Sequence, residues 1–428
     1  MRDIIEHRNE LLGDTYYEVR HETGLTILVY PKAGYSTSYA VIGTNYGSID
    51  DALKVKGGEE KVLPWGTAHF LEHKLFESEE LDAFERFAET GASANAYTTF
   101  DRTCYLFSCS SNFQKNLEIL LDFVQHPYFT QATVEKEQGI IGQEIRMYLD
   151  EPGWQVLFNL LKSLYHKHPV KVDIAGTEES ISHITADLLY ECYESFYNLN
   201  NMVLACAGNV TVDDVLSICD NCLQETPEVL VERPDKGEPA DIVRPFIAQE
   251  FAVTIPTFAL GFKETHETPI RNMKERILTD LLMDVVGGET SELYERLLRE
   301  GLIDTGFGYE YFTGPGYATV IFEGRSRDPE RVAEAIKAEI RKLRETGVDP
   351  AEFDRLRKMN YGKTVMSYND IDGLANGLVG AYMNGAELFE ELDLYREITV
   401  EDANEQLKHQ MLEEYSALSV VHGPSETI

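Results

Sequence analysis

The chain has 428 residues, of which 43% are hydrophobic and 26% are charged, a composition that excludes a disordered or collagen-like protein. Its 38 Lys and Arg stand against 74 Asp and Glu, so the formal net charge is −36. A charge of this sign repels phosphate backbones and anionic lipid surfaces, so nucleic acids and membranes are not expected as partners. Two explanations of the acidity stay open, namely solubility and an acidic chamber that attracts cationic peptides.

The N-terminus and the cysteines bear on the compartment. The first residues, MRDIIEHRNELLGD, are charged and lack the apolar region of a secretory signal, and no apolar run approaches the about 18 residues of a membrane span. Six Cys do not form a disulfide framework in a chain of this length. We therefore expect a cytoplasmic protein. The lone C-x-x-C of Cys219 and Cys222 is interpreted as two cysteines on one helical turn rather than as a redox or zinc half-site.

The predicted elements follow the same order in the two halves of the chain. The first half has predicted strands at 25–31, 38–47, 93–99, 103–109 and 202–208, and predicted helices at 66–76, 79–89, 112–126, 131–150, 154–166, 186–197 and 211–223. The second half has predicted strands at 252–257, 258–262, 305–312, 317–324 and 416–423, and predicted helices at 270–286, 290–300, 328–345, 350–367, 370–383 and 400–412. A pattern repeated about 210 residues apart indicates a duplicated unit.

A proline-rich, charged segment without periodicity separates the halves. We expect one domain at 1–225, a linker at 226–245 and a second domain at 246–428. Strands that neighbour one another as hairpins, with grouped helices, predict α+β domains, each a mixed sheet with helices on one side. No G-x-G-x-x-G follows a strand and no Walker A motif is present, so nucleotide binding has no support.

The segment LPWGTAHFLEHKLFE (63–77) carries an H-x-x-E-H pattern on a predicted helix. His69 and His73 are four residues apart and share a helix face, so both imidazoles can reach one ion, and Glu72 lies on the same side. Imidazole suits zinc, and this spacing is the inverzincin pattern, in which the Glu acts as general base. The alternative is two surface histidines on an acidic helix. The apolar neighbours Phe70 and Leu71 argue against it, because two buried His and a Glu need partners.

An open zinc site needs a third protein ligand. The predicted helix at 131–150 carries Glu137 and Glu144, which are seven residues apart and therefore on one face. One carboxylate can ligate the metal while the other supports the site. The alternative, that both are solvated helix carboxylates, stays open from the spacing alone.

These motifs resemble the pitrilysin/insulinase/mitochondrial-processing-peptidase family of zinc peptidases over essentially the whole chain. The segments that carry the resemblance, in order, are NYGSIDD (45–51), GTAHFLEHKLFE (66–77), TGASANAYTTFDRTCYLF (90–107) and the stretch 168–215. Within the family the chain is similar to the zinc-bearing member of a paired set from Firmicutes. The fold that the resemblance implies is two homologous α/β-roll domains that form a clamshell around a chamber.

The resemblance also implies roles for particular residues. It makes Glu144 the zinc ligand and Glu137 the supporting glutamate, beside Glu72 as general base. The zinc ligands would be His69, His73 and Glu144, and the edge strand to which a substrate backbone adds would include Asn95, Ala96 and Tyr97.

One departure concerns the second domain, which in active members supplies an Arg and, seven residues later, a Tyr. Arg299 matches the Arg, but Asp304 or Gly306 stands where the Tyr is expected, and Tyr309 and Tyr311 are out of register. The counterpart of the zinc helix, LTDLLMDVVGG (278–288), lacks the ligands. The resemblance therefore implies a dimer in which a homologous chain without zinc supplies the Arg/Tyr pair, or a nearby Tyr that substitutes for it.

Taken together, these observations predict a zinc-dependent endopeptidase that cleaves peptides or unfolded segments, with cationic peptides as candidate substrates. The alternative is a non-catalytic scaffold subunit of a paired peptidase, which the missing Tyr favours and the complete set of predicted ligands does not.

Overall fold

The computed structural model describes residues 3–79, 81–264 and 272–424. It divides into two compact units. The first comprises residues 1–145, 173–234 and 364–390, and the second comprises residues 146–172, 235–363 and 391–428. Among the residues described, no helix combines the length and the apolar character that crossing a bilayer requires.

The first unit is built on a seven-stranded mixed sheet with the order β1-β2-β3-β9-β4-β8-β7. β3 and β9 are parallel, and the other neighbouring strands are antiparallel. The strands are β1 (Ile4–Asn9), β2 (Asp14–Arg20), β3 (Thr26–Pro31), β4 (Ser38–Thr44), β7 (Ser93–Thr98), β8 (Thr103–Cys109) and β9 (Met202–Gly208). A separate short pair is formed by β5 (Ala52–Leu53) and β6 (Lys61–Val62).

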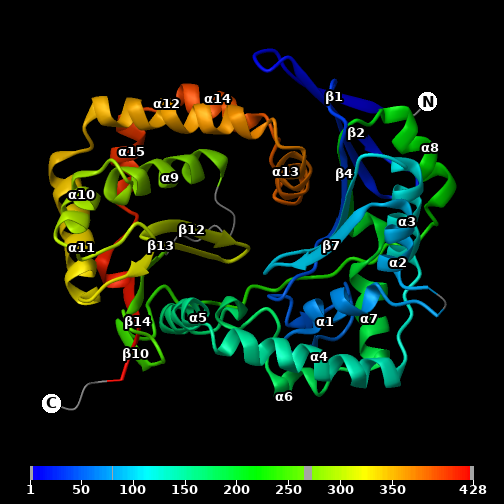
Figure 1. The fold of residues 1–428 in the computed structure, drawn as a ribbon, viewed down its shortest axis with the longest axis horizontal. Helices are drawn as coiled ribbons and strands as arrows, with labels where there is room; N and C mark the ends of the chain where they lie inside the picture. Colours follow the sequence, from blue (N-terminus) through cyan, green and yellow to red (C-terminus); the bar gives the residue numbers. More distant parts are fainter. Residues whose placement is uncertain (1–2, 80, 265–271, 425–428) are drawn as a thin grey trace. The chain divides into compact units, whose positions relative to one another are not determined.

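Helices cover both faces of this sheet (Figure 1). The main core lies on one face, under α1 (Thr67–Leu75), α2 (Ala83–Thr90), α3 (Phe113–Gln125), α4 (Gln131–Leu149), α6 (Glu178–Ile181), α7 (Ala186–Phe196) and α8 (Val212–Cys222). The opposite face is covered by α13 (Ile371–Met383). Gly43 of β4 permits this contact, since an added Cβ would lie 3.1 Å from the side chains of Val379 and Met383.

The second unit is built on a five-stranded mixed sheet with the order β10-β14-β11-β13-β12. Its strands are β10 (Phe246–Glu250), β11 (Thr257–Lys263), β12 (Gly308–Gly314), β13 (Tyr317–Arg325) and β14 (Ser416–His422). The core face carries α9 (Met273–Gly287), α10 (Glu292–Arg299), α11 (Pro329–Thr346), α12 (Pro350–Ser367), α14 (Glu390–Glu397) and α15 (Val400–Leu407). The opposite face carries α5 (Pro152–Leu164), whose Leu160 and Leu164 pack over Gly261.

The two sheets confirm the predicted duplication and the α+β class. Strands β3-β9-β4-β8-β7 and β10-β14-β11-β13-β12 have the same order along the chain and the same pattern of one parallel and three antiparallel pairings. Gly43 and Gly261 occupy equivalent places under α13 and α5. The helix on the second face of each sheet is an addition to the expected arrangement of helices on one side.

Each unit takes one helix from the half of the chain that forms the other unit. Residues 146–172, with α5, belong to the second unit, and residues 364–390, with α13, belong to the first. The units therefore differ from the contiguous ranges 1–225 and 246–428 expected from the sequence. The change from the first unit to the second at 234–235 falls inside the expected linker at 226–245, which holds no helix or strand longer than an isolated bridge.

Most predicted elements are present, and the differences are local. The predicted strand at 252–257 is wrong, because the backbone at 252–256 forms no ladder and β10 lies earlier, at 246–250. Pro256 cannot donate to a ladder, which agrees with this break. The N-terminal hairpin of β1 and β2 and the helix α14 were not predicted. The first two residues of the predicted helix at 270–286 lie outside the described residues.

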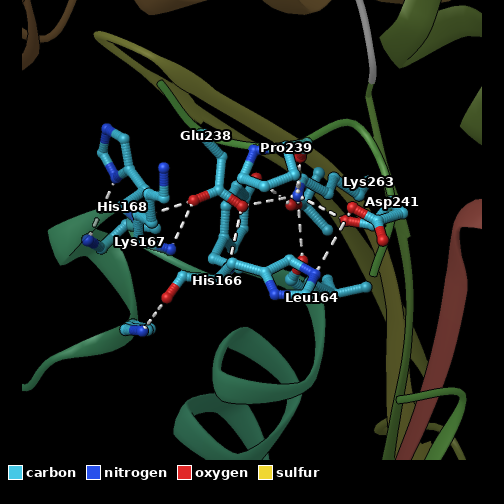
Figure 2. A network of polar contacts seen from close by, with 12 residues as sticks. Leu164, His166, Lys167, His168, Glu238, Pro239, Asp241 and Lys263 are labelled. Carbon is cyan, nitrogen blue, oxygen red and sulfur yellow. Dashed lines mark hydrogen bonds and ion pairs between the residues drawn. The ribbon is translucent and has the colours of Figure 1, made fainter. Parts of the chain in front are cut away.

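A buried ion pair fixes the linker to the second unit (Figure 2). Glu238 accepts hydrogen bonds from the three consecutive backbone N–H groups of 166–168, at 2.6–2.8 Å. Its Oε1 also lies 2.7 Å from the buried ammonium of Lys263 on β11. The same ammonium donates to backbone carbonyls of Leu164, Pro239 and Asp241. The end of α5, the linker and β11 are thereby joined at one point.

Candidate metal centre

The helix α1 begins where two loops meet backbone to backbone. Gly66, just before the helix, has φ 89°, and an added Cβ would lie 2.3 Å from the carbonyl oxygen of Ala175. Only glycine fits this conformation and this contact. Phe70, Leu71 and Leu75 then anchor the helix in the core, each at most 1% exposed. This packing fixes the position of the helix along its axis and its rotation about that axis. The side chains on its opposite face, His69, Glu72 and His73, are fixed with it.

The structure brings both histidines to one carboxylate of α4. Nε2 of His69 lies 3.8 Å from Oε1 of Glu144, and Nε2 of His73 lies 3.6 Å from Oε2 of the same side chain. One nitrogen or oxygen of each residue lies within 4.8 Å of the other two. The apolar face of α4, with Val134, Ile141 and Ile145 in the core, sets this direction. Of the two glutamates that the sequence left open as third ligand, Glu144 is the one whose carboxylate lies near both Nε2 atoms.

Glu137 contacts the other ring nitrogen of His73. Its Oε1 lies 2.9 Å from Nδ1 of His73, and the side chain is only 9% exposed. When Nδ1 carries the proton and donates it to Glu137, the lone pair of Nε2 is free on the side of Glu144. Burial lowers the pKa of His73, but the Glu137 hydrogen bond and the charges of Glu72, Glu137 and Glu144 outweigh it and raise the pKa.

His69 is held in its neutral form. Burial, followed by the charge of His73, lowers the pKa of His69 to about 3. Its Nδ1 is fully buried and has no hydrogen-bond partner among the described residues. A neutral imidazole is the form that ligates metals, and a buried His held so close to a second His is costly without an ion to bind.

Glu72 lies beside the ligands without being one of them. It is 8% exposed, and its Oε2 accepts a hydrogen bond of 2.6 Å from the hydroxyl of Thr98, on the edge strand β7. Burial raises the pKa of Glu72, and the Thr98 hydrogen bond and the charge of His73 act in the opposite direction. A carboxylate with a raised pKa is suited to take up a proton near neutral pH.

The predicted substrate strand forms the outer edge of the first sheet. β7 is the last strand in the order and pairs with β8 alone among the described residues. Asn95 is exposed, whereas Ala96 and Tyr97 are half-buried. The Tyr97 hydroxyl donates to Oδ1 of Asn376 on α13 at 2.7 Å. The helix that comes from the second half of the chain therefore supports the strand next to the metal centre.

Arg299 is the last residue of α10 and belongs to the second unit. Its side chain is 76% exposed and lies 3.7 Å from Glu295. Its role toward a substrate stays a prediction. The nearby Tyr309 is engaged within the second unit, because its hydroxyl donates to Oδ1 of Asp284 at 2.5 Å, and Asn360 donates to the other oxygen at 2.6 Å.

The donor set fits a zinc ion. The imidazoles of two histidines and one carboxylate converge. The second ring nitrogen of one histidine is hydrogen-bonded to another carboxylate, and a further carboxylate lies beside the three. This is the composition of an open catalytic zinc site. This is a candidate site defined by its residues.

Two positions of the site were missed from the sequence. Thr98 was inside the segment quoted for the resemblance, but only the fold shows that its hydroxyl faces Glu72. Asn376 lies 279 residues from Tyr97 and carries no local signal.

A separate cavity of about 240 Å³, lined by Tyr16, Leu28 and Tyr382 among others, shares no residue with the metal centre.

Comparisons with known proteins show the family of the chain. Residues 47–178 match the family described as Insulinase (Peptidase family M16), and residues 183–360 match the Peptidase M16 inactive domain. The chain is 38% identical over 408 residues to the uncharacterized zinc protease YmfH of Bacillus subtilis (strain 168), covering 94% of this chain and 95% of that protein.

Solved structures show the same fold. A putative M16-like peptidase from Alicyclobacillus acidocaldarius has a TM-score of 0.93 at 35% identity, covering 98% of this chain and 100% of that chain. A protease from Helicobacter pylori has a TM-score of 0.84 at 18% identity, covering 95% and 99%, and supports the fold alone.

Proposed function

Because the chain belongs to the M16 peptidase family and is similar to YmfH, as its motifs indicated, we propose that it is a zinc-dependent endopeptidase of the inverzincin type. The observation that carries the proposal is the convergence of His69, His73 and Glu144, with Glu72 beside them. A zinc ion held by these three residues would supply Lewis-acid polarisation of the scissile carbonyl.

Three residues of the chain have the remaining roles in the proposed reaction. Glu72 takes a proton from the attacking water and delivers it to the leaving amine, and its raised pKa suits both transfers. Thr98 holds the carboxylate in one orientation. Glu137 fixes the tautomer of His73, so that Nε2 stays available as a ligand. The loss of any of these contacts would leave the ligands present and reduce the rate.

The substrate is an extended peptide or unfolded segment that adds as a strand to the outer edge of β7. Main-chain hydrogen bonds would provide affinity without reading side chains. The net charge of −36 favours cationic peptides. An enclosed chamber, as the resemblance implies, would restrict substrates to flexible chains.

We further propose a partner, namely a homologous chain without the zinc ligands that supplies an Arg/Tyr pair. Two observations support it: no Tyr follows Arg299 at the expected spacing, and the Tyr309 hydroxyl is already bound to Asp284. Peptidase turnover by the purified chain alone, unchanged in Arg299→Ala, would contradict a required partner.

The central test measures cleavage and zinc together. A peptide library is incubated with the wild type, Glu72→Gln and His69→Ala, with and without the homologous chain. We expect about one zinc per chain in the wild type and Glu72→Gln, loss of zinc in His69→Ala, and cleavage only by the wild type with the homologous chain present. Equal cleavage by Glu72→Gln would contradict its role as base. A wild-type chain that never binds zinc would support the non-catalytic scaffold instead.

A further inference from the structure

The outer edge of β7 presents alternate backbone N–H groups away from the sheet. In the turn that follows β7, the N–H of Thr99 donates to the carbonyl of Arg102 at 2.8 Å, which places it on the side of β8. N–H groups alternate in direction along a strand of an antiparallel pair. Those of Ala94, Ala96 and Thr98 therefore point outward, where no strand pairs with β7 among the described residues.

The middle one of these outward groups is already occupied. The N–H of Ala96 donates to Oδ1 of the Asn95 side chain at 2.9 Å. Asn95 is exposed and adjoins this group in sequence, so its amide carbonyl lies where an added strand would place a peptide carbonyl. The two acceptors have the same chemistry, because each is an amide oxygen.

We propose that the Asn95 side chain is a placeholder for the substrate carbonyl on the edge strand, and that an incoming peptide displaces it. This inference rests on the proposed function, since it concerns the strand to which that peptide adds. Because the hydrogen bond must be exchanged rather than formed anew, Asn95 weakens peptide binding. The same contact satisfies one N–H group on the exposed edge of β7, which could otherwise pair with a strand of another chain.

The first measurement concerns the free protein and needs no substrate. Amide hydrogen exchange of the segment 93–98 is followed by mass spectrometry in the wild type, Asn95→Ala, Asn95→Asp and the control Ser93→Ala. We expect one additional fast-exchanging amide in Asn95→Ala, because its acceptor is gone, and slow exchange in Asn95→Asp, which keeps an oxygen at that place. Ser93→Ala, an exposed position on the same strand three residues from Ala96, is expected to match the wild type.

The second measurement concerns the peptide. A neutral, end-blocked peptide from those that the wild type cleaves is titrated into Glu72→Gln and into the same chain with each Asn95 substitution added. We expect Asn95→Ala to bind the peptide about three- to tenfold more tightly, because the peptide then forms its hydrogen bond to the N–H of Ala96 without breaking one to Asn95. Asn95→Asp is expected to show no such gain.

The outcomes separate this inference from the proposed function. Unchanged exchange in Asn95→Ala, or weaker peptide binding by it, would overturn the placeholder role, and the second result would make Asn95 a direct substrate contact. In both cases cleavage by the wild type and its loss in Glu72→Gln would leave the proposed function standing. If the wild type cleaves no peptide even with the homologous chain present, the proposed function fails and the placeholder role fails with it.

Discussion

The hydroxyl of Thr98 donates to Oε2 of Glu72 at 2.6 Å, so the edge strand β7 and the helix α1, which carries the candidate metal ligands, are joined through the side chain proposed as the general base. A peptide that adds to β7 therefore lies on the same strand that orients this carboxylate. In the proposed mechanism, peptide binding and proton transfer would therefore be coupled through one threonine, two residues from Ala96.

We predict that Thr98→Val lowers kcat about 10-fold or more while the zinc content is unchanged. Valine keeps the shape of threonine and removes the O–H donor, so Glu72 loses the contact that orients it, and with it part of the about 100- to 10,000-fold that a positioned general base contributes. Steady-state cleavage of a peptide, with zinc measured in the same samples, checks this. Thr98→Ser restores the hydroxyl and should recover most of the rate. A valine variant with the kcat of the wild type would show that Thr98 does not position the base.

Glu137→Gln should weaken zinc affinity about 10- to 100-fold without changing the stoichiometry at saturating zinc. The glutamine amide is a neutral and therefore weaker acceptor for the Nδ1–H of His73 than the glutamate carboxylate. The tautomer that leaves the lone pair of Nε2 free is then less favoured. Competition with a chromogenic chelator measures the affinity. Glu135→Gln is the matched control, because Glu135 is exposed on the same helix, two residues away. Equal affinities of the two variants would remove Glu137 from the metal site.

The packing of α5 on the second sheet can be tested at a single glycine. An added Cβ at Gly261 would lie 2.8 Å from Cδ2 of Leu160. We predict that Gly261→Ala destabilises the protein by about 1–3 kcal/mol, because the leucine must shift within a packed layer. Gly139→Ala in α4 has no atom within 4 Å of its added Cβ and should stabilise by about 0.5–1 kcal/mol. Urea unfolding of both variants gives the comparison, and a stabilised Gly261→Ala would contradict the close contact.

The Glu238–Lys263 pair predicts an acid-dependent stability. Burial raises the pKa of Glu238, but the Lys263 hydrogen bond and the backbone N–H groups of 166–168 outweigh it and hold the pKa at about 2. Because the pKa of Glu238 is lower in the folded protein than the unfolded value of 4.5, this carboxylate stabilises the folded protein at pH values above 4.5. The contribution is lost as the pH falls toward 2. We predict that Glu238→Gln lowers the unfolding free energy at pH 6 by about 1–2 kcal/mol, allowing for solvent screening. The difference from the wild type should shrink at pH 3, and a difference independent of pH would mean that the charge of Glu238 is not responsible.

The helix that carries the candidate metal ligands could be predicted from the sequence because its determinants are local. Residues four apart on a helix share a face whatever surrounds it, so His69 and His73 required no knowledge of the fold. The same holds for the duplicated order of strands and helices, which periodicity and turn residues reveal, and which the matching topologies of the two sheets confirm.

Long-range contacts were decided only by the tertiary structure. Helical spacing placed Glu137 and Glu144 on one face, but which of them meets Nε2 and which meets Nδ1 depends on how α4 crosses α1. The hydroxyl of Thr98 on β7 reaches Glu72 on α1, and α5 and α13 each cover the sheet of the other half. An amphipathic pattern states that a helix has an apolar face, and does not state which of two similar sheets will bury it.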